Sequence, residues 1–202
     1  SGEVYGAGSP TGFGTSDQPK LQPSGIRSAY PNAKLSSEFL LEGWSRATNG
    51  DARIARLFHT FGAGFSLDDG RSFADIITAA ALGRDIKLYS DGSSKRNFLY
   101  IEDAVAAIFT LLLAGEESIK SDVGGESKIS IKDFADVTAS IAGVSVVTMD
   151  EGSKGARHAV QGDPPEPNTG KLRSLGWLPK VSLEDGVQRT VTRLRNRLGK
   201  LN

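Results

Sequence analysis

The stretch SAYPNAKLSSEFLLEGWSRATNGDARIARLFHTF, residues 28–61, sets the fold class of this chain. Its first part carries apolar residues at helical spacing, which predicts a helix over residues 28–47 with those residues in the core. They are Leu35, Phe39, Leu40 and Trp44. Asn49 and Gly50 end the helix, and the mostly apolar residues 52–61 predict a buried strand. A helix followed by a buried strand is typical of an α/β domain.

The same alternation continues through the rest of the chain. We expect helices over residues 72–82, 103–113, 131–142 and 183–198, and short strands over residues 86–90, 97–101 and 144–149. Ser130 is placed to cap the third of these helices. The last helix carries four arginines, which we interpret as a solvated surface and not as a binding site. The pattern as a whole predicts fold class α/β.

Composition limits the classes of function. A chain of 202 residues with 38% hydrophobic residues suits one domain, or one and a half. Its 24 Lys and Arg balance 24 Asp and Glu, so no global basic field attracts nucleic acid. It has no cysteine and two histidines, so we expect no disulfide and no metal site. No apolar run reaches the ~18–20 residues that span a bilayer, and we expect a cytoplasmic protein with no membrane partner.

The glycine-rich segment GAGSPTG, residues 6–12, superficially resembles a dinucleotide-binding fingerprint. That fingerprint requires a helix immediately after the glycines, because the amides of the helix N-terminus hold the pyrophosphate. Here residues 13–25, FGTSDQPKLQPSG, follow, and they cannot begin a helix. We therefore reject the match and expect this chain to lack a phosphate-binding loop of its own.

Tyr30 and Lys34 form a stronger signal. Residues four apart share a face of a helix, so the phenol and the ammonium group project to the same side. A nearby cation stabilises phenolate, which makes the tyrosine a usable general base. Pro31 is compatible with a position near the helix start. Upstream, SGEVYG (residues 1–6) reads as the end of a strand with a serine hydroxyl at its tip.

Together these motifs resemble the extended short-chain dehydrogenase/reductases, specifically the nucleotide-sugar epimerases, dehydratases and decarboxylases. Those enzymes carry Ser/Thr-x-x-x-Tyr-Gly at a strand end and then Tyr-x-x-x-Lys on a helix. The resemblance continues in the family's order to the end of the chain. It runs through RLFHTFG (56–62), DGR (69–71), SDGSSKRNFLYIED (90–103), LGWLP (175–179) and SLEDG (182–186). The family's N-terminal part, with its glycine-rich loop, is missing from this match.

The resemblance implies the C-terminal part of a Rossmann-type doubly wound parallel sheet plus a smaller α/β substrate-binding region. Residues 1–62 would be a remnant of the dinucleotide-binding domain, with the Ser, Tyr and Lys residues of the active site. Residues 63–202 would mainly bind the nucleotide sugar, with some segments returning to the first domain. It further implies NAD as cofactor, a nucleoside-diphosphate sugar as partner, and a homodimer. The missing N-terminal half would be needed to bind NAD, so this chain alone should not turn over.

By the same resemblance, Tyr30 takes the proton from the sugar 4-hydroxyl while hydride passes to the nicotinamide. Lys34 binds the nicotinamide ribose, Ser1 hydrogen-bonds the same hydroxyl, and Phe58 also contributes to cofactor binding. In the family's dehydratases a glutamate at the position of Glu3 removes the proton at C5. Those enzymes often have an aspartate just before it as the acid for the leaving hydroxyl, where this chain has glycine.

Substrate binding is implied for four further residues. Arg71 and Arg96 are candidates for the diphosphate, since guanidinium forks match phosphate oxygens in geometry and charge. Arg157 is a candidate for a further phosphate contact. His59 occupies a position where relatives place an asparagine facing the substrate, and either a hydrogen-bonding or a structural role is open.

The predicted function is therefore an NAD-dependent epimerase or dehydratase that oxidises C4 of a nucleoside-diphosphate sugar transiently, in cell-surface polysaccharide or activated-sugar biosynthesis. One alternative is a UDP-uronic acid decarboxylase, since LDDGRSFADI (67–76) and Glu3 resemble that branch. Against it, the arginine that decarboxylases carry after Gly-Pro in this loop is absent, where the chain reads GAG (62–64). An alternative of another class is a non-catalytic module that holds a nucleotide sugar without a cofactor.

Overall fold

The computed structural model describes residues 1–5, 28–115, 118–149 and 164–199. Its helices are η1 (Gly2–Tyr5, a 3₁₀ turn), α1 (Ala29–Thr48), α2 (Ser72–Ala81), α3 (Ile101–Leu113), α4 (Ile131–Ala142), α5 (Gly170–Ser174) and α6 (Leu183–Leu198). Its strands are β1 (Arg53–Leu57), β2 (Thr60–Phe61), β3 (Ile86–Leu88), β4 (Lys95–Arg96), β5 (Leu99–Tyr100), β6 (Ile119–Val123), β7 (Ile129–Ser130) and β8 (Val146–Thr148). All five predicted helices are present, within two residues of the predicted bounds.

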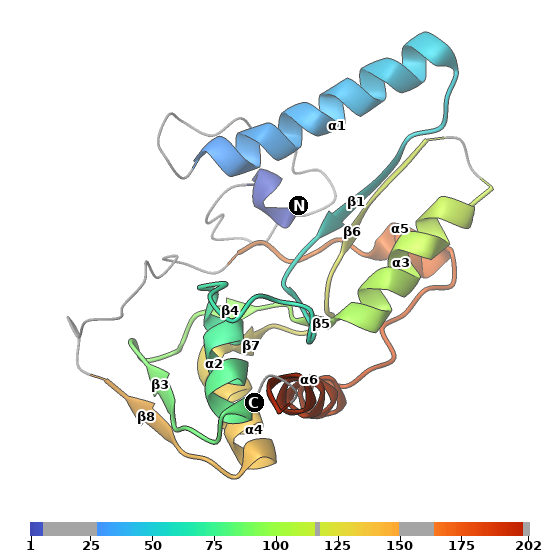
Figure 1. Ribbon diagram of the computed structural model, residues 1–202. Helices are drawn as coiled ribbons and strands as arrows, with labels where there is room; N and C mark the ends of the chain where they lie inside the picture. Colours follow the sequence, from blue (N-terminus) through green and yellow to red (C-terminus); the bar gives the residue numbers. More distant parts are fainter. Residues whose placement is uncertain (6–27, 116–117, 150–163, 200–202) are drawn as a thin grey trace.

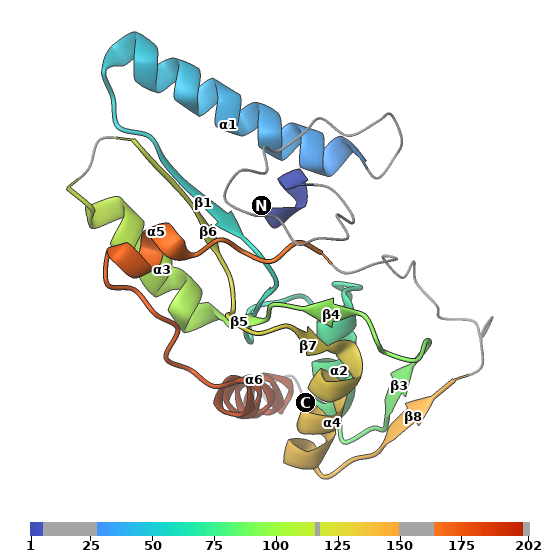
Figure 2. The ribbon, with the colours of Figure 1, turned by 180° about the vertical axis from the view of Figure 1, so that it is seen from behind.

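One part of the molecule is built on the parallel pair β1 and β6, whose register joins Arg53 to Ile119 and Leu57 to Val123. Figures 1 and 2 show α1 on one side of this pair and α3 and α5 on the other. Apolar side chains on the α3 and α5 side form a buried cluster. It includes Ala107, Leu111, Val123, Leu172 and Trp177. Parallel strands with helices on both faces are how a doubly wound domain is constructed.

The other part consists of α2, α4 and α6, which pack together beside short strand pairs (Figure 1). β3 runs parallel to β8, and β4 runs antiparallel to β7. The core between the helices is aromatic at its centre. Phe61 meets Phe134 edge to face at 5.5 Å between ring centroids, and Phe98 lies 4.4 Å from Phe134. Edge-to-face and offset ring pairs of this kind add to the stabilisation from burial.

Local sequence signals fix the ends of α4. The Ser130 hydroxyl accepts a hydrogen bond from the Asp133 N–H at 2.9 Å, and Asp133 reaches back to the Ser130 N–H at 3.4 Å. This reciprocal pair is a capping box, so the predicted cap is confirmed. Gly143, with φ of 72°, ends the helix in the left-handed region that glycine tolerates.

The arginines of α6 bind groups of the protein itself. Arg195 donates to the carbonyl oxygens of Ala80 and Ala142, at 3.2 and 3.1 Å, where α2 and α4 end. Arg197 donates to the carbonyl oxygens of Ala63 and Phe65. Cationic side chains stabilise helix C-termini because the last carbonyls have no partner within the helix. Arg195 therefore caps α2 and α4, and Arg197 binds the segment that follows β2, where the sequence predicted only a solvated surface.

The strand predicted over residues 52–61 is interrupted in the structure at Phe58 and His59. The Phe58 N–H still donates to the Val123 carbonyl at 2.9 Å, as the last bond of the β1–β6 ladder. The chain then turns, and the Leu99 N–H donates to the His59 carbonyl at 3.0 Å as β2 pairs with β5. The interruption therefore marks the crossing from one part of the molecule to the other.

The prediction of a strand end at SGEVYG is wrong. Residues 2–5 form η1, because the Val4 N–H donates to the Ser1 carbonyl at 3.2 Å and closes a turn within the segment. An extended segment would instead need hydrogen bonds to a neighbouring strand. Gly2 and Val4 are buried by this turn, while Glu3 is exposed.

The predicted core face of α1 is also corrected. Leu35 is buried, but Phe39, Leu40 and Trp44 are 56%, 74% and 51% exposed. The helix instead turns Glu38 toward the strands, where it meets Arg56 of β1. A two-stranded pair offers a narrow surface, and the ion pair occupies the part of it that a second row of apolar side chains would need.

Candidate active site

Tyr30 and Lys34 lie in the first turns of α1. The Lys34 Nζ atom is 5.5 Å from the centroid of the Tyr30 ring, so the two side chains share a face, as their spacing predicts. Tyr30 is 51% exposed, which leaves its phenol open to a ligand. The phenol and the ammonium group therefore lie together at an exposed position on α1.

Ser1 and Glu3 lie beside this face, because η1 packs against α1 (Figure 1). The Ser1 hydroxyl accepts from the Glu3 N–H at 3.3 Å, so the hydroxyl and the carboxylate are carried by the same short turn.

Arg71 directly precedes α2. Asp69 accepts from its Nε and Nη2 atoms, the latter at 2.6 Å, and this hydrogen bonding raises the pKa of Arg71. Tyr30 adds to that shift through its charge interaction with Arg71. The Arg71 guanidinium therefore lies within electrostatic range of the Tyr30 phenol, although α2 and α1 belong to different parts of the molecule.

His59 lies at the interruption between β1 and β2. Burial, together with the positive charges of Arg96 and Arg71, lowers its pKa to about 4. The imidazole is therefore neutral at neutral pH. Its ring meets Phe98 edge to face at 6.1 Å, and its buried Nδ1 atom has no hydrogen-bond partner among the described residues. Arg96, on β4, is buried and donates to the Lys95 carbonyl at 2.7 Å.

Charge interactions link four of the predicted residues, because Arg71 and Arg96 both act on His59 and Tyr30 acts on Arg71. They are Tyr30, His59, Arg71 and Arg96. Arg157 and the GAGSPTG segment lie outside the described residues. Within the described ranges, no three histidine and carboxylate side chains gather as a metal would require.

Phe58 has a buried ring, 8% exposed, that packs against Tyr5 at 6.4 Å between ring centroids. The ring also lies directly under Gly2, since a Cβ atom at Gly2 would be 2.8 Å from it. The space beside Glu3, where the family's dehydratases often carry an aspartate, is therefore filled by an aromatic ring. A role for Phe58 in cofactor binding stays a prediction.

A buried ionic cluster lies next to this site, and the sequence patterns gave no signal for it. Arg56 donates to Glu38 and to the Tyr5 hydroxyl, and Tyr5 in turn donates to Asp122. In the sequence, Glu38 is distinguished only by its place on the predicted helix, four residues after Lys34. Asp122 and Tyr5 are 117 residues apart, so no local pattern joins them.

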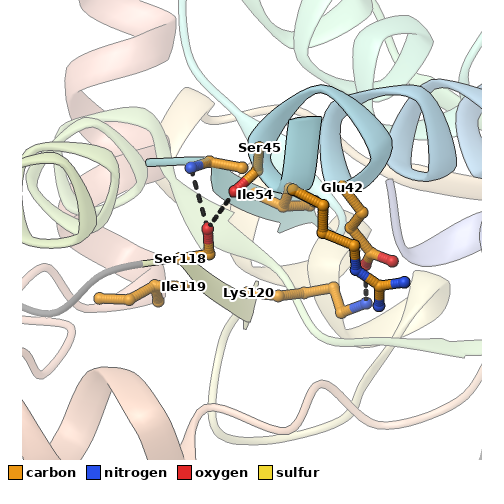
Figure 3. Close-up of a pocket in the computed structure, with 8 residues that line it drawn as sticks. Glu42, Ser45, Ile54, Ser118, Ile119 and Lys120 are labelled. Atoms are coloured by element: carbon orange, nitrogen blue, oxygen red, sulfur yellow. Dashed lines mark hydrogen bonds and ion pairs between the residues drawn. The ribbon is translucent and has the colours of Figure 1, made fainter. Parts of the chain in front are cut away.

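A separate cavity of about 330 Å³ lies between the second half of α1 and the β1–β6 pair. Figure 3 shows that four of its polar side chains pair with one another. Lys120 pairs with Glu42 at 2.6 Å, and the Ser118 hydroxyl lies 2.8 Å from that of Ser45. The cavity is remote from Tyr30 in the helix, and it brings together none of the predicted site residues.

The family model described as "NAD dependent epimerase/dehydratase family" matches residues 1–124. The chain belongs to this family. Among the curated relatives, UDP-glucuronic acid decarboxylase 4 of Arabidopsis thaliana is 30% identical over 182 residues, which cover 88% of this chain and 39% of that protein. UDP-glucuronic acid decarboxylase 1 of Xenopus tropicalis is 29% identical over 182 residues, with 88% and 41% covered. The chain thus spans about two fifths of the length of these relatives.

Solved structures resemble the fold closely. UDP-glucuronic acid 4-epimerase from Bacillus cereus, in complex with UDP-glucuronic acid and NAD, matches with a TM-score of 0.77 and 24% identity over 97% of this chain and 59% of that one. The dTDP-glucose 4,6-dehydratase of Bacillus anthracis, in complex with NAD, matches with a TM-score of 0.76 and 20% identity over 98% and 61%. The predicted fold class, a partial Rossmann-type α/β fold, is confirmed.

None of the helices in the described part of the chain is both long and apolar enough to cross a lipid bilayer.

Proposed function

We propose that the whole protein is an NAD-dependent epimerase or dehydratase that oxidises C4 of a nucleoside-diphosphate sugar transiently, in activated-sugar biosynthesis in the cytoplasm. The observation that carries this proposal is the placement of Tyr30 and Lys34 side by side on an exposed face of α1, next to the η1 turn with Ser1 and Glu3. Membership of the NAD-dependent epimerase/dehydratase family supports the same chemistry.

In this proposal Tyr30 accepts the proton of the sugar 4-hydroxyl. Lys34 stabilises the phenolate and binds the hydroxyls of the nicotinamide ribose, and Ser1 donates a hydrogen bond to the sugar oxygen. The exposed Tyr30–Lys34 face fits the ribose and nicotinamide end of a dinucleotide. The chemistry that bound NAD would supply in this site is the reversible acceptance of hydride from C4. A general base of this kind accelerates reactions by ~10²–10⁴-fold.

Substrate binding is assigned to Arg71, Arg96 and His59, with Arg157 as a fourth contact. The two arginines supply positive charge for the diphosphate, and both act on His59. The neutral imidazole can donate or accept one hydrogen bond, and its unpartnered Nδ1 atom is consistent with a place kept for a ligand or water. The three described members of this set come from β4, from the β1–β2 interruption and from the residue before α2.

A longer polypeptide is part of the proposal. The chain covers about three fifths of the solved neighbours, and apolar residues of α1 and α3 are exposed on both sides of the β1–β6 pair. They include Leu40 at 74% and Leu113 at 79%. We assign the α3 side to an N-terminal half that binds NAD, and the α1 side to a second subunit in a homodimer. Residues 1–62 would belong to the dinucleotide-binding domain, with β6, α3 and α5 returning to it.

A second candidate reaction, decarboxylation of a UDP-uronic acid, is favoured by the contact between Gly2 and Phe58. Elimination of water needs an acid for the leaving hydroxyl, and the ring of Phe58 fills the place beside Glu3. Once C4 of a uronate is a ketone, its C6 carboxylate is that of a β-keto acid and loses carbon dioxide without such an acid. The decarboxylases among the curated relatives support this candidate.

The test is to incubate the whole protein with a panel of nucleotide sugars and to identify the products by mass. Loss of water indicates dehydration, loss of carbon dioxide indicates decarboxylation, and an isomer of unchanged mass indicates epimerisation. Tyr30→Phe is the matched negative control. A protein that binds a nucleotide sugar but retains no NAD and gives no product would overturn the proposal in favour of a non-catalytic binding module.

A further inference from the structure

Four polar side chains from four different elements, three of them buried and Tyr5 half-buried, meet at Arg56. Arg56 donates to Glu38 of α1 through Nε at 2.9 Å and through Nη2 at 2.6 Å. Its Nη1 atom donates to the Tyr5 hydroxyl of η1 at 2.5 Å. That hydroxyl donates to Asp122 of β6 at 2.9 Å, and the Asn168 N–H, just before α5, donates to the same carboxylate at 2.9 Å. We name Glu38, Arg56, Tyr5 and Asp122 the Arg56 frame.

Removing any one side chain of the frame would take a hydrogen-bond or ion-pair partner from a buried charged group. Glu38, Arg56 and Asp122 are each 4–5% exposed, and a buried charge is costly unless a partner compensates it. The guanidinium also stacks on the Tyr5 ring, with its central carbon 5.0 Å from the ring centroid. The Glu38 carboxylate binds the guanidinium through two nitrogen atoms, and the Tyr5 ring packs against it. Together they hold the guanidinium in one orientation.

Protonation states support this direction of hydrogen bonding. Burial and the neighbouring Asp122 raise the pKa of Tyr5 to about 12, against the opposing effect of Arg56. Burial also raises the pKa of Asp122. The Tyr5 hydroxyl therefore keeps its proton across the physiological range and stays a donor to Asp122.

The position of Glu38 connects the frame to the site. Glu38 lies one helical turn after Lys34 on the buried face of α1, with Pro31 and Leu35, and this face adjoins the exposed face that carries Tyr30 and Lys34. Holding Glu38 therefore fixes the rotation of α1 about its axis and with it the direction of the catalytic pair. Tyr5, at the other end of the frame, is the last residue of the turn that begins with Ser1 and Glu3.

We propose that the Arg56 frame is the positioning device that holds the Ser1–Glu3 turn against the Tyr30–Lys34 face of α1. The four residues touch no reacting atom in this scheme. They act through the two segments that they join. Arg56 and Asp122 stand on neighbouring parallel strands, so the rigid pair β1–β6 is the base on which both segments are held.

A spectroscopic experiment tests the frame without reference to turnover. The chain has four tyrosines, so a protein labelled with ¹³C in the tyrosine rings gives one signal set per residue. Tyr5→Phe removes the hydroxyl that lies between Arg56 and Asp122. The Arg56 Nη1 and Asp122 Oδ1 atoms, which are 4.0 Å apart in the unmutated protein, can then form a direct ion pair and release η1. We expect the Tyr30 ring resonance to shift or broaden in Tyr5→Phe and in Glu38→Gln.

The matched control is Tyr100→Phe, which removes the hydroxyl of a tyrosine that is 2% exposed and remote from the frame. Its Tyr30 resonance should match that of the unmutated chain. An unchanged Tyr30 resonance in both Tyr5→Phe and Glu38→Gln would overturn the proposal. Glu38→Gln keeps the size of the side chain, so it serves if Tyr5→Phe fails to fold.

Kinetics on the whole protein give a second readout, which rests on the proposed function. Misplacement of a catalytic group by about 1 Å lowers the rate ~10²-fold, so kcat should fall by about that factor in either variant while KM changes by less than about threefold. The double variant should cost less than the product of the two single effects, because both act through Arg56. Multiplicative effects, or a change confined to KM, would count against the frame. If the unmutated protein turns over no nucleotide sugar, the proposed function fails and the spectroscopic result still decides the frame.

Discussion

A Cβ atom at Gly2 would lie 2.8 Å from the ring of Phe58. This contact joins the η1 turn to the end of the β1 strand, and it leaves no room for any side chain at the residue before Glu3. Gly124 packs against the base of the same side chain, since a Cβ atom at Gly124 would lie 3.1 Å from the Phe58 Cβ atom. The contact therefore bears both on stability and on the reaction that the site can perform.

Gly2→Ala should destabilise the protein by about 1–3 kcal/mol, the usual cost of adding a methyl group to a packed interior. Urea unfolding measures the effect. Gly64→Ala is the control, because nothing lies within 4 Å of a Cβ atom there. Equal unfolding free energies for the two variants would show that Phe58 moves aside easily.

Tyr30→Phe should lower kcat of the whole protein by ~10²–10⁴-fold, because the phenol is assigned as the general base. Binding of the nucleotide sugar, measured by calorimetry, should change little. Tyr89→Phe, at an exposed tyrosine outside the site, is the matched control and should retain full activity. Near-normal turnover of Tyr30→Phe would remove the base from the scheme.

His59 should make stability depend on pH. Its pKa in the folded protein is about 4, against an ordinary value of about 6.5. Above pH 6.5 both states are neutral. As the pH falls from 6.5 to 4, the unfolded chain binds a proton that the folded protein does not, so stability is lost. The total loss is about 3 kcal/mol, from the difference in pKa at 1.36 kcal/mol per unit.

The measurement is the free energy of unfolding of the unmutated protein and of His59→Gln between pH 7 and pH 4. The two curves should converge as the pH falls, because only the unmutated protein loses this contribution. Parallel curves would mean that His59 is protonated as easily in the folded protein as in the unfolded chain.

Arg195→Ala should cost about 1–2 kcal/mol, because it removes charged hydrogen bonds to the ends of both α2 and α4. Arg193→Ala, two residues earlier, removes an exposed ion pair with Glu102 at 3.4 Å. Exposed pairs contribute ~0–1 kcal/mol. Thermal unfolding of the two variants compares them, and an equal loss would show that the caps contribute no more than the surface pair.

Leu40→Glu should shift the whole protein from dimer to monomer if the exposed face of α1 is the subunit interface. A charge placed at the centre of an apolar contact must be buried without a partner. Sedimentation velocity distinguishes the two states. Lys87→Glu, on an exposed position of β3, is the control, and a protein that is monomeric before mutation would rule out this interface.

The helices could be predicted from the sequence because their signals are local. α4 has its cap, its apolar face and its terminal glycine within 14 residues, and its bounds were predicted correctly. The β6 strand was missed because IKSDV has no apolar run and no alternation that marks it. Asp122 can be buried there only because Tyr5 and the Asn168 N–H bind it, and those partners are distant in the sequence.

The site divides in the same way. Tyr30 and Lys34 were predictable because one helical turn brings them together. The Arg56 frame was not, since Glu38 and Arg56 lie on different elements and their contact depends on how α1 crosses β1. The break at His59 was missed for a related reason. Residues 52–61 are mostly apolar and resemble one strand, and only the separate pairing of β1 with β6 and of β2 with β5 divides them.

The break at His59 has a consequence for protein engineering. The chain crosses between the two parts of the molecule there and crosses back before α3, and β6 returns to pair with β1. A single cut after residue 62 would therefore not yield two independent modules, because one product would lack half of its parallel strand pair. Grafting a new sugar specificity onto this scaffold requires exchanging separate segments on either side of α3 and β6 while leaving those two elements in place.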